Sequence, residues 1–367
     1  MRLYPPSILG VMGSGQLGRM FAQRAIEKGY IVKVFSPDKN SPAFKVGAIE
    51  SVEDYENLEA LELFLNSIQA LTFEFENIPE KTLSFIDEYS KKNLLRVSPS
   101  VNSIKIAQDR FKEKEFFKSI GLQVTDFFKI DETTDIVQLI KEIEFPFIIK
   151  TNRFGYDGKG QKKIHSLKEL EDYFKDFQIK DHILEKIIPF DKEISVIGAR
   201  FDSGKIFIFP PSENIHKNHI LDFTIHPASI QSELIKKAEH YTRILLEKLG
   251  YVGVLGLEIF VKDNELICNE FAPRPHNSGH YTMNASSYSQ FDLQLYALTN
   301  IELELDRIST KNSIMKNIIG FEAENYLHLH SKPNLFYHDY QKSEPKIGRK
   351  MGHWNYIGNN SKEEIFG

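Results

Sequence analysis

The chain has 367 residues, of which 41% are hydrophobic and 26% charged, and its formal net charge is −5. This length exceeds what one compact core usually supports and indicates two or three packed domains. The acidic balance gives no reason to expect nucleic-acid binding, the single cysteine excludes an internal disulfide and fits a reducing cytoplasm, and no apolar run of about 18 residues is present that could span a membrane.

Strand and helix patterns alternate over about the first hundred residues. Strands are expected at 7–12, 31–35 and 70–75, and helices at 16–28, 58–68 and 79–91. This alternation predicts a parallel sheet covered by helices, so the N-terminal part of the chain is expected to be an α/β domain.

Farther along, the strands are joined by turns more often than by helices. After a helical segment at 103–119, strands are expected at 145–150, 183–185, 193–199, 206–209, 254–261 and 265–271, and a helix at 231–248. This pattern predicts an antiparallel α+β domain. The residues after 300 mix short strands with turns and are expected to form a small appended subdomain.

Gly13, Gly15 and Gly18 satisfy the G-x-G-x-x-G pattern between the first expected strand and the first helix. The pattern is compatible with a phosphate held at the helix N-terminus, and equally with a tight strand-to-helix turn. A dinucleotide-binding fold would place an acidic residue at the end of the second strand, but Ser36 stands there and Asp38 comes two residues later. An NAD-dependent dehydrogenase is therefore a disfavoured alternative.

A second glycine-rich segment, residues 155–161, begins five residues after Lys150. Its glycines leave backbone N–H groups free, so the segment could fold over nucleotide phosphates while Lys150 supplies a counter-charge. It is not a Walker A loop, because the G-K-[ST] ending is missing. We favour a phosphate-covering loop over a plain hairpin turn.

The most informative stretch surrounds two carboxylates twelve residues apart, Glu258 and Glu270. On neighbouring strands they would offer Mg²⁺ the oxygen ligands that it prefers, while leaving positions for substrate phosphates. Arg274, His276 and Asn277 follow at once and are suited to an anionic, hydrogen-bonding small molecule. A polar hairpin end with ordinary surface charges is the less favoured alternative.

A shared metal site constrains the register of these two strands. A two-residue turn at 263–264 with regular pairing would put Glu258 and Glu270 on opposite faces. A three-residue turn or a single β-bulge would put both on one face, so we predict an odd register with Asn264 in a left-handed conformation. The side chains expected on the carboxylate face are Val254, Phe260, Leu266 and Cys268.

A basic cluster occupies residues 342–353 near the C-terminus. A solvated run of charges is the usual interpretation. Because Gly348 and Gly352 bracket Arg349, we favour a loop that wraps closely around an anion.

Taken together, these segments resemble the ATP-grasp enzymes, and within them the 5-(carboxyamino)imidazole ribonucleotide synthase family. The resemblance covers nearly the whole chain. It is carried by GSGQLGRM, TFEFENIP, AQDRFKEKEFF, IIKTNRFGYDGKGQ, EKIIPFDKEISVIGAR, NEFAPRPHNSGH, SQFDLQLYAL and GRKMGH.

The resemblance implies a domain organisation and an activity. An N-terminal parallel α/β domain (1–105) would precede a two-lobed antiparallel α+β ATP-grasp core (106–300, with a small lid lobe at about 122–190) and a C-terminal subdomain (301–367). The implied reaction uses ATP and bicarbonate to carboxylate the exocyclic amine of 5-aminoimidazole ribonucleotide through carboxyphosphate, in de novo purine biosynthesis. It also implies Mg²⁺ (or Mn²⁺) as the cofactor, a homodimer and a cytoplasmic location.

Matching positions imply the following roles. ATP would be bound by Arg110, Lys150, Gly155, Tyr156, Asp157, Gly158, Lys159, Gly160, Gln161, Glu185, Lys186, Ile187, Ile188, Glu193, His216, Asn269 and Glu270. The metal would be held by Glu258 and Glu270. The imidazole ribonucleotide would contact Tyr156, Asp157, Arg274, His276, Asn277, Lys342 and Arg349. Lys150, Arg274 and Asp157 are the catalytic candidates, with Asp157 taking the proton of the amine.

Other functions remain as alternatives. Another ATP-grasp ligase, or a formate-using transformylase, would share Lys150 and the two metal carboxylates but lack the Tyr156–Asp157 and His276–Asn277 pairs. A non-catalytic nucleotide-binding module is disfavoured because both metal carboxylates are intact.

Overall fold

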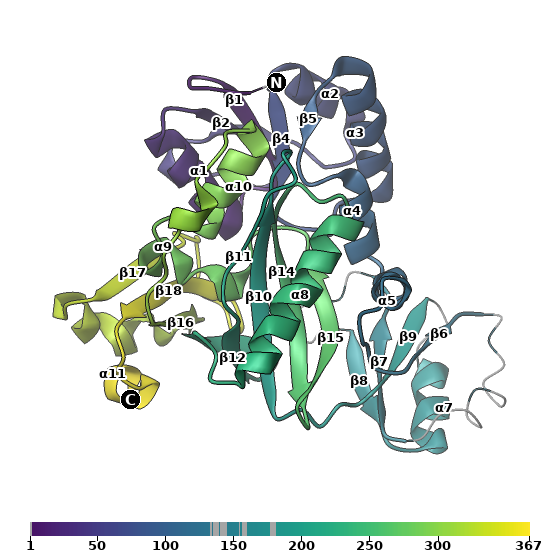
Figure 1. Cartoon of the computed structure of the whole chain (residues 1–367). Helices are drawn as coiled ribbons and strands as arrows, with labels where there is room; N and C mark the ends of the chain where they lie inside the picture. Colours follow the sequence, from purple (N-terminus) through teal and green to yellow (C-terminus); the bar gives the residue numbers. More distant parts are fainter. Residues whose placement is uncertain are drawn as a thin grey trace.

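The computed structural model describes residues 2–132, 134, 139, 145–153, 155, 160–176 and 181–367. The described chain forms a parallel N-terminal sheet, a large antiparallel sheet and a small antiparallel sheet. Figure 1 shows them at the top, in the centre and at the lower right. None of the helices in these described ranges combines the length and the apolarity that a membrane crossing requires.

The N-terminal sheet has five parallel strands in the order β3-β2-β1-β4-β5, which confirms the predicted α/β domain. Its strands are β1 (Ile8–Met12), β2 (Ile31–Ser36), β3 (Ile49–Val52), β4 (Ala70–Phe73) and β5 (Arg96–Val97). Its helices are α1 (Gln16–Glu27), η1 (Phe44–Val46), α2 (Leu58–Asn66) and α3 (Glu80–Asn93). The strand order reverses between β1 and β4, and α/β sheets form their ligand-binding crevice at such a switch point.

A helix from later in the chain covers one face of this sheet. Leu9 and Val11 of β1 pack in one core cluster with Phe291, Leu295 and Leu298 of α10 (Gln290–Thr299). Side chains of α2 and α3 cover the opposite face. The N-terminal domain is therefore joined by a continuous apolar core to the part of the chain that follows it.

The predicted helical segment 103–119 is two helices, α4 (Val101–Ala107) and α5 (Arg110–Ser119). The break falls at Asp109, whose side chain accepts a hydrogen bond from the backbone N–H of Lys112 at 3.1 Å. Because an N-cap residue has a non-helical backbone conformation, Asp109 separates the two helices. The apolar periodicity of the segment does not reveal this break.

The small sheet has the order β6-β9-β7-β8, and its strand pairs are antiparallel. In the described residues it comprises β6 (Phe127–Ile130), β7 (Phe147–Thr151), β8 (Gln161–Ile164) and β9 (His182–Lys186), with α7 (Leu167–Asp176) on one side. The lid lobe predicted at about 122–190 encloses all of these elements.

The large sheet follows the path β15-β14-β10-β12-β13-β16-β18-β17, with β11 paired to β10. Its strands are β10 (Lys192–Arg200), β11 (Ile206–Ile208), β12 (Ser212–Lys217), β13 (Ile220–His226), β14 (Gly253–Lys262), β15 (Glu265–Ala272), β16 (Ser313–Ile319), β17 (Leu335–Asp339) and β18 (Lys350–Ile357). Helix α8 (Ser232–Lys248) matches the helix predicted at 231–248, and it packs against this sheet. The other short elements are η2 (Asn277–Gly279), α9 (Thr282–Ala285), η3 (Leu305–Arg307), η4 (Glu322–Ser331) and α11 (Lys362–Phe366).

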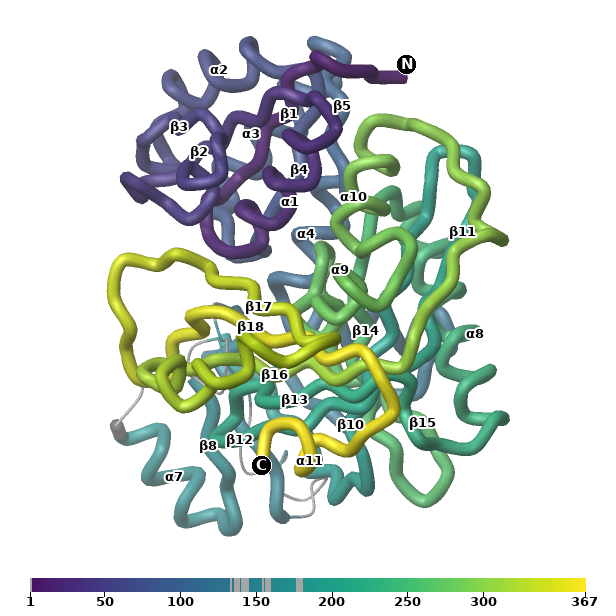
Figure 2. The backbone as a smooth tube through the Cα atoms, turned by 90° about the vertical axis from the view of Figure 1, so that its left-hand side faces the viewer, coloured from purple at the N-terminus to yellow at the C-terminus, as the bar shows by residue number. Residues whose placement is uncertain are grey.

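The sequence did not predict β12 and β13, nor that the C-terminal strands continue the large sheet. Strand β13 pairs with β16, so the C-terminal subdomain is hydrogen-bonded into the sheet and is not a separate appendage. Figure 2 shows β16, β17 and β18 below the N-terminal domain. Polar residues such as Asn214, Thr224 and His226 are buried in these strands, so the alternation of apolar and polar residues that marks a strand is weak there.

Candidate active site

A β-bulge places Glu258 and Glu270 at one site. The turn between β14 and β15 has two residues, Asp263 and Asn264, with φ of 48° and 62°. Farther from the turn the register shifts by one residue, so that Glu258 of β14 faces both Asn269 and Glu270 of β15. The predicted odd register is therefore confirmed in its bulge form, and so is the left-handed Asn264.

The prediction of which apolar side chains share the carboxylate face is partly wrong. Leu266 and Cys268 belong to the hydrophobic core that includes α8, because pairing between the turn and the bulge is regular. Strand alternation puts Val254 and Phe260 on the same face as Glu258, as predicted.

The carboxyl groups around the bulge lie in different electrostatic environments. Arg110 contacts Glu270 at 2.7 Å (Nη1 to Oε2). Burial opposes ionisation of Glu270, but the charges of Arg110, Lys150 and Lys114 together outweigh burial and lower the pKa of that carboxyl to about 2. Burial and the nearby charges of Glu258 and Glu270 raise the pKa of Glu193 to about 9. A divalent cation would relieve this crowding of carboxylates.

The donor set fits Mg²⁺. No cluster of three or more His, Cys, Asp or Glu side chains suited to a metal occurs in the described ranges. Mg²⁺ usually binds one or two carboxylates and keeps waters and substrate phosphates, which is what Glu258 and Glu270 beside a pocket would provide. The amide of Asn269 lies 3.5 Å from Glu258 (Nδ2 to Oε2) and adds a further oxygen donor nearby.

Lys150 and Glu185 form a buried ion pair on the small sheet. The Nζ atom of Lys150 on β7 lies 2.8 Å from Oε2 of Glu185 on β9. Burial opposes ionisation of Glu185, but Lys114 and Lys150 outweigh burial and lower its pKa to about 2. Burial lowers the pKa of Lys150. The other oxygen of Glu185 has no hydrogen-bond partner among the described residues, so it is available to a ligand.

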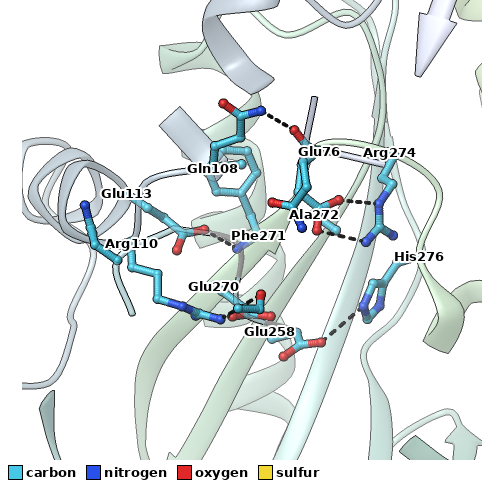
Figure 3. A pocket seen from close by; sticks show the side chains of 14 residues that line it. Glu76, Gln108, Arg110, Glu113, Glu258, Glu270, Phe271, Ala272, Arg274 and His276 are labelled. Atoms are coloured by element: carbon cyan, nitrogen blue, oxygen red, sulfur yellow. Dashed lines mark hydrogen bonds and ion pairs between the residues drawn. The ribbon is translucent and has the colours of Figure 1, made fainter. Parts of the chain in front are cut away.

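Arg274 is held by a residue of the N-terminal domain. Its guanidinium donates two hydrogen bonds to Glu76, at 2.7 Å and 3.2 Å. His276 lies 3.2 Å from Glu258 (Nε2 to Oε1). Figure 3 shows these side chains around one pocket, with Glu258 and Glu270 below Arg274 and to the left of His276. The pocket is lined by Glu76, Asn77, Ala107, Gln108, Arg110, Glu113, Asn152, Gly155, Glu258, Glu270, Phe271, Ala272, Arg274 and His276.

The first glycine-rich loop holds a carboxylate of the protein itself. Glu74 follows β4 and accepts hydrogen bonds from the backbone N–H groups of Gly15 and Gly18, at 2.5 Å and 2.6 Å. A β-carbon at Gly13 would overlap the Glu74 side chain. The N-terminus of α1 is therefore already occupied by the carboxyl group of Glu74, which favours the interpretation of this motif as a structural turn.

Six of the predicted site residues line the pocket within the described part of the chain: Arg110, Gly155, Glu258, Glu270, Arg274 and His276. Glu193 and His216 pair with each other on β10 and β12, at 3.4 Å. The side-chain amide of Asn277 is buried and has no hydrogen-bond partner in the described residues.

The remaining predicted residues lie beside or away from the pocket. Gly160 and Gln161 end the β7–β8 connection, and residues 186–188 leave the end of β9. Lys342 and Arg349 do not line the pocket: Lys342 lies 5.6 Å from the Tyr340 ring centroid, and Arg349 donates to the Glu344 carbonyl at 2.9 Å. Tyr156, Asp157, Gly158 and Lys159 lie outside the described residues.

Glu74, Glu76 and Gln290 are not among the residues predicted from the sequence to form the site. The side-chain amide of Gln290 makes two hydrogen bonds to the backbone of His276. Its oxygen accepts from the His276 N–H, and its nitrogen donates to the His276 carbonyl, each at 2.8 Å. The two glutamates follow β4 at the switch point of the sheet, and that position was a usable signal. For Gln290 we find no comparable signal in the sequence.

Comparison with known proteins defines the class. Models of the ribonucleotide synthetase preATP-grasp domain, the ATP-grasp domain and the phosphoribosylaminoimidazole carboxylase C-terminal domain match residues 7–108, 115–291 and 313–365. The chain is therefore an ATP-grasp ligase, and the dehydrogenase alternative is wrong.

Two relatives identify the family within the ATP-grasp ligases. N5-carboxyaminoimidazole ribonucleotide synthase of Brucella melitensis is 38% identical over 96% of this chain and 96% of its own. The Staphylococcus aureus enzyme is 37% identical over 96% of this chain and 92% of its own. The chain belongs to the N5-carboxyaminoimidazole ribonucleotide synthase family.

Solved structures agree with this assignment. The Staphylococcus aureus synthetase in complex with ADP has a TM-score of 0.91 at 35% identity, covering 99% of this chain and 96% of that one. The Aspergillus clavatus synthase in complex with ADP and 5-aminoimidazole ribonucleotide has a TM-score of 0.86 at 25% identity, with the same coverage.

Proposed function

We propose that this chain uses ATP and bicarbonate to carboxylate the exocyclic amine of 5-aminoimidazole ribonucleotide, as a step of purine biosynthesis. The products are N5-carboxyaminoimidazole ribonucleotide, ADP and phosphate. The observation that carries the proposal is the pocket in which Glu258 and Glu270 share one face beside the Glu76–Arg274 pair and His276. Membership of the family supports the choice of reaction.

ATP is proposed to bind between the two sheets of the ATP-grasp core. Lys150 and Arg110 supply counter-charges for its phosphates, and residues 155–161 cover them. Residues 185–188 line the adenine pocket, Glu193 accepts hydrogen bonds from the ribose, and His216 makes a further contact with the nucleotide. Mg²⁺ bound by Glu258 and Glu270, with Asn269 beside them, would neutralise phosphate charge.

In the first step, an oxygen of bicarbonate attacks the γ-phosphorus of ATP, and ADP leaves. Phosphoryl transfer depends on positioning and charge neutralisation more than on covalent catalysis. Arg274 is suited to hold bicarbonate because its guanidinium is fixed by Glu76 and cannot lose its charge. The product of this step is carboxyphosphate.

In the second step, the amine nitrogen forms a bond to the carboxyl carbon, and phosphate leaves. The amine loses a proton in this step, and we assign Asp157 as the base that accepts it. His276, Asn277 and Tyr156 would orient the imidazole, and Lys342 and Arg349 would bind the ribonucleotide phosphate. Covering the site by the glycine-rich loop would limit hydrolysis of carboxyphosphate by water.

Isotope transfer tests the intermediate. With ¹⁸O-labelled bicarbonate, one labelled oxygen should appear in the inorganic phosphate for each molecule of product. Phosphate that carries no label would contradict carboxyphosphate. Replacing bicarbonate with formate should give no product, which separates this proposal from a formate-using transformylase.

Two further proposals concern the whole molecule. The family resemblance supports a homodimer, for which light scattering should give about twice the chain mass of 42.4 kDa. A cytoplasmic location is supported by the cysteine count, because a chain with one cysteine, Cys268, contains no internal disulfide. Fractionation of the cell of origin tests the location.

A further inference from the structure

Strand β15 is the outermost strand of the large sheet. On its free side, the Cys268 N–H donates to the carbonyl of Gln123 at 2.7 Å. Beyond Cys268 comes the bulge, where the register shift disturbs the regular alternation of backbone groups. Some backbone N–H and C=O groups at the bulge are therefore not paired with β14, and they need hydrogen-bond partners from elsewhere in the protein.

Two consecutive side chains of α5 supply these partners. The Phe271 N–H donates to Oε1 of Glu113 at 2.7 Å. Nζ of Lys114 donates to the carbonyl of Asn269. Glu113 and Lys114 are 1% and 2% exposed, so water does not compete for these bonds. Figure 3 shows Glu113 reaching from its helix to the Phe271 backbone.

The spacing of the bonded groups is specific to the bulge. Outward N–H groups of a regular strand recur at every second residue. Here they are found at Cys268 and Phe271, three residues apart. Glu113 therefore accepts from an N–H that regular pairing would not present on this side.

Lys114 also connects the bulge to the small sheet. Its Nζ lies 3.7 Å from Oε2 of Glu185, the same oxygen that binds Lys150. Arg110, one turn earlier on α5, contacts Glu270 directly. One face of α5 thus touches both the metal carboxylate and the residues expected to meet the nucleotide.

We propose that Glu113 and Lys114 are positioning residues, which fix the bulge in β15 and thereby keep Glu270 on the same face as Glu258 for a divalent cation. Without them, buried donor and acceptor groups of the bulge would be left unpaired, and regular pairing would become competitive. Regular pairing turns Glu270 away from Glu258. The inference rests on the proposed role of these carboxylates.

The test measures binding of Mn²⁺ to the full chain in the presence of ADP, by electron paramagnetic resonance of free Mn²⁺. Lys114→Met removes the donor but keeps the length of the side chain. Glu113→Met removes the acceptor, and Glu113→Gln keeps an acceptor oxygen. Lys112→Met and Glu115→Met are the controls, because these residues flank the pair on the same helix and are exposed.

Lys114→Met and Glu113→Met should each weaken Mn²⁺ binding by about 10- to 100-fold, the range found for residues that orient metal ligands. Glu113→Gln should recover most of the loss, and both controls should stay near the wild-type affinity. A purely structural role would lower thermal stability without weakening Mn²⁺ binding in the folded protein.

Wild-type affinity in folded Lys114→Met and Glu113→Met overturns the inference alone. Wild-type protein that binds no Mn²⁺ with ADP overturns the proposed metal site together with the inference. If both variants fail to fold, hydrogen exchange of the wild-type protein decides the matter. Peptides covering 268–272 should then exchange far more slowly than the hairpin turn at 263–264, and equal rates contradict the inference.

Discussion

Glu76 and Arg274 are joined by two hydrogen bonds across the boundary between the N-terminal domain and the ATP-grasp core. Burial opposes ionisation of Glu76, but Arg274 outweighs burial and lowers the pKa of this carboxyl. Glu76 follows β4, and Arg274 follows β15. The N-terminal domain therefore contributes directly to the pocket and does not only support it.

Glu76→Gln should lower kcat/KM for 5-aminoimidazole ribonucleotide by about tenfold or more, because a charge-assisted hydrogen bond contributes about 1.5–3 kcal/mol. Steady-state kinetics of the purified variant measures this. Glu80→Gln is the matched control, since Glu80 contacts Arg153 at 3.3 Å with 65% of its side chain exposed. Equal losses in the two variants would contradict a specific role for Glu76.

Glu270→Gln should raise the Mg²⁺ concentration needed for half-maximal activity, because one of the two carboxylates expected to bind the cation is lost. A rise of about tenfold is expected, as measured by titrating Mg²⁺ at saturating ATP. Glu265→Gln on the same strand should change nothing, since its side chain is 56% exposed and pairs with Lys237. An unchanged Mg²⁺ requirement in Glu270→Gln would remove Glu270 from the metal site.

Gly13→Ala should destabilise the protein by more than the conformational cost of a left-handed alanine. Gly13 has φ of 101°, and its added β-carbon would also overlap Glu74. Gly204→Ala isolates the conformational cost, because Gly204 has φ of 82° and no atom within 4 Å of the added carbon. Urea unfolding should show a loss at least about 1 kcal/mol larger for Gly13→Ala. Similar losses would mean that Glu74 moves aside freely.

His226 should make stability fall as the pH is lowered. Burial lowers the pKa of this imidazole to about 4, whereas the unfolded chain binds the proton with an ordinary pKa near 6.5. The unfolded state is therefore favoured as pH falls from about 6.5 towards 4, and the loss should reach about 2 kcal/mol between pH 7.5 and 5.

Denaturant unfolding over this pH range measures the slope. His226→Gln should reduce it, since glutamine does not titrate. His240→Gln should leave it unchanged, because His240 is exposed on α8. A slope that survives in His226→Gln would assign the pH dependence to other groups.

Much of the fold followed from periodicity, because the N-terminal strands and α8 have strong apolar patterns. Periodicity failed for β12 and β13, where buried polar side chains are hydrogen-bonded to one another across the pair of strands. For example, Thr224 bonds Asn214 across the β12–β13 pair at 3.1 Å. Tertiary contacts of this kind leave no local signal.

The candidate site was predictable where its residues are contiguous. Glu258, Glu270, Arg274 and His276 were found because they lie in one hairpin and the loop after it, and the bulge followed from requiring both carboxylates on one face. Glu76 contributes from a separate domain, where its partner could not be known. The glycine-rich loop at α1 was equally compatible with a phosphate site and with a structural turn. The position of Glu74 in the structure distinguishes these two interpretations.

Carboxylation of 5-aminoimidazole ribonucleotide tests the central claim most directly. The purified protein would be mixed with ATP, Mg²⁺, ¹³C-bicarbonate and the ribonucleotide, and both ADP and the ¹³C-carbamate of the product would be quantified by NMR. The account predicts one labelled carbamate for each ADP formed, and almost no ADP when the ribonucleotide is omitted. ADP formation that does not depend on the ribonucleotide, with no labelled carbamate, would contradict it.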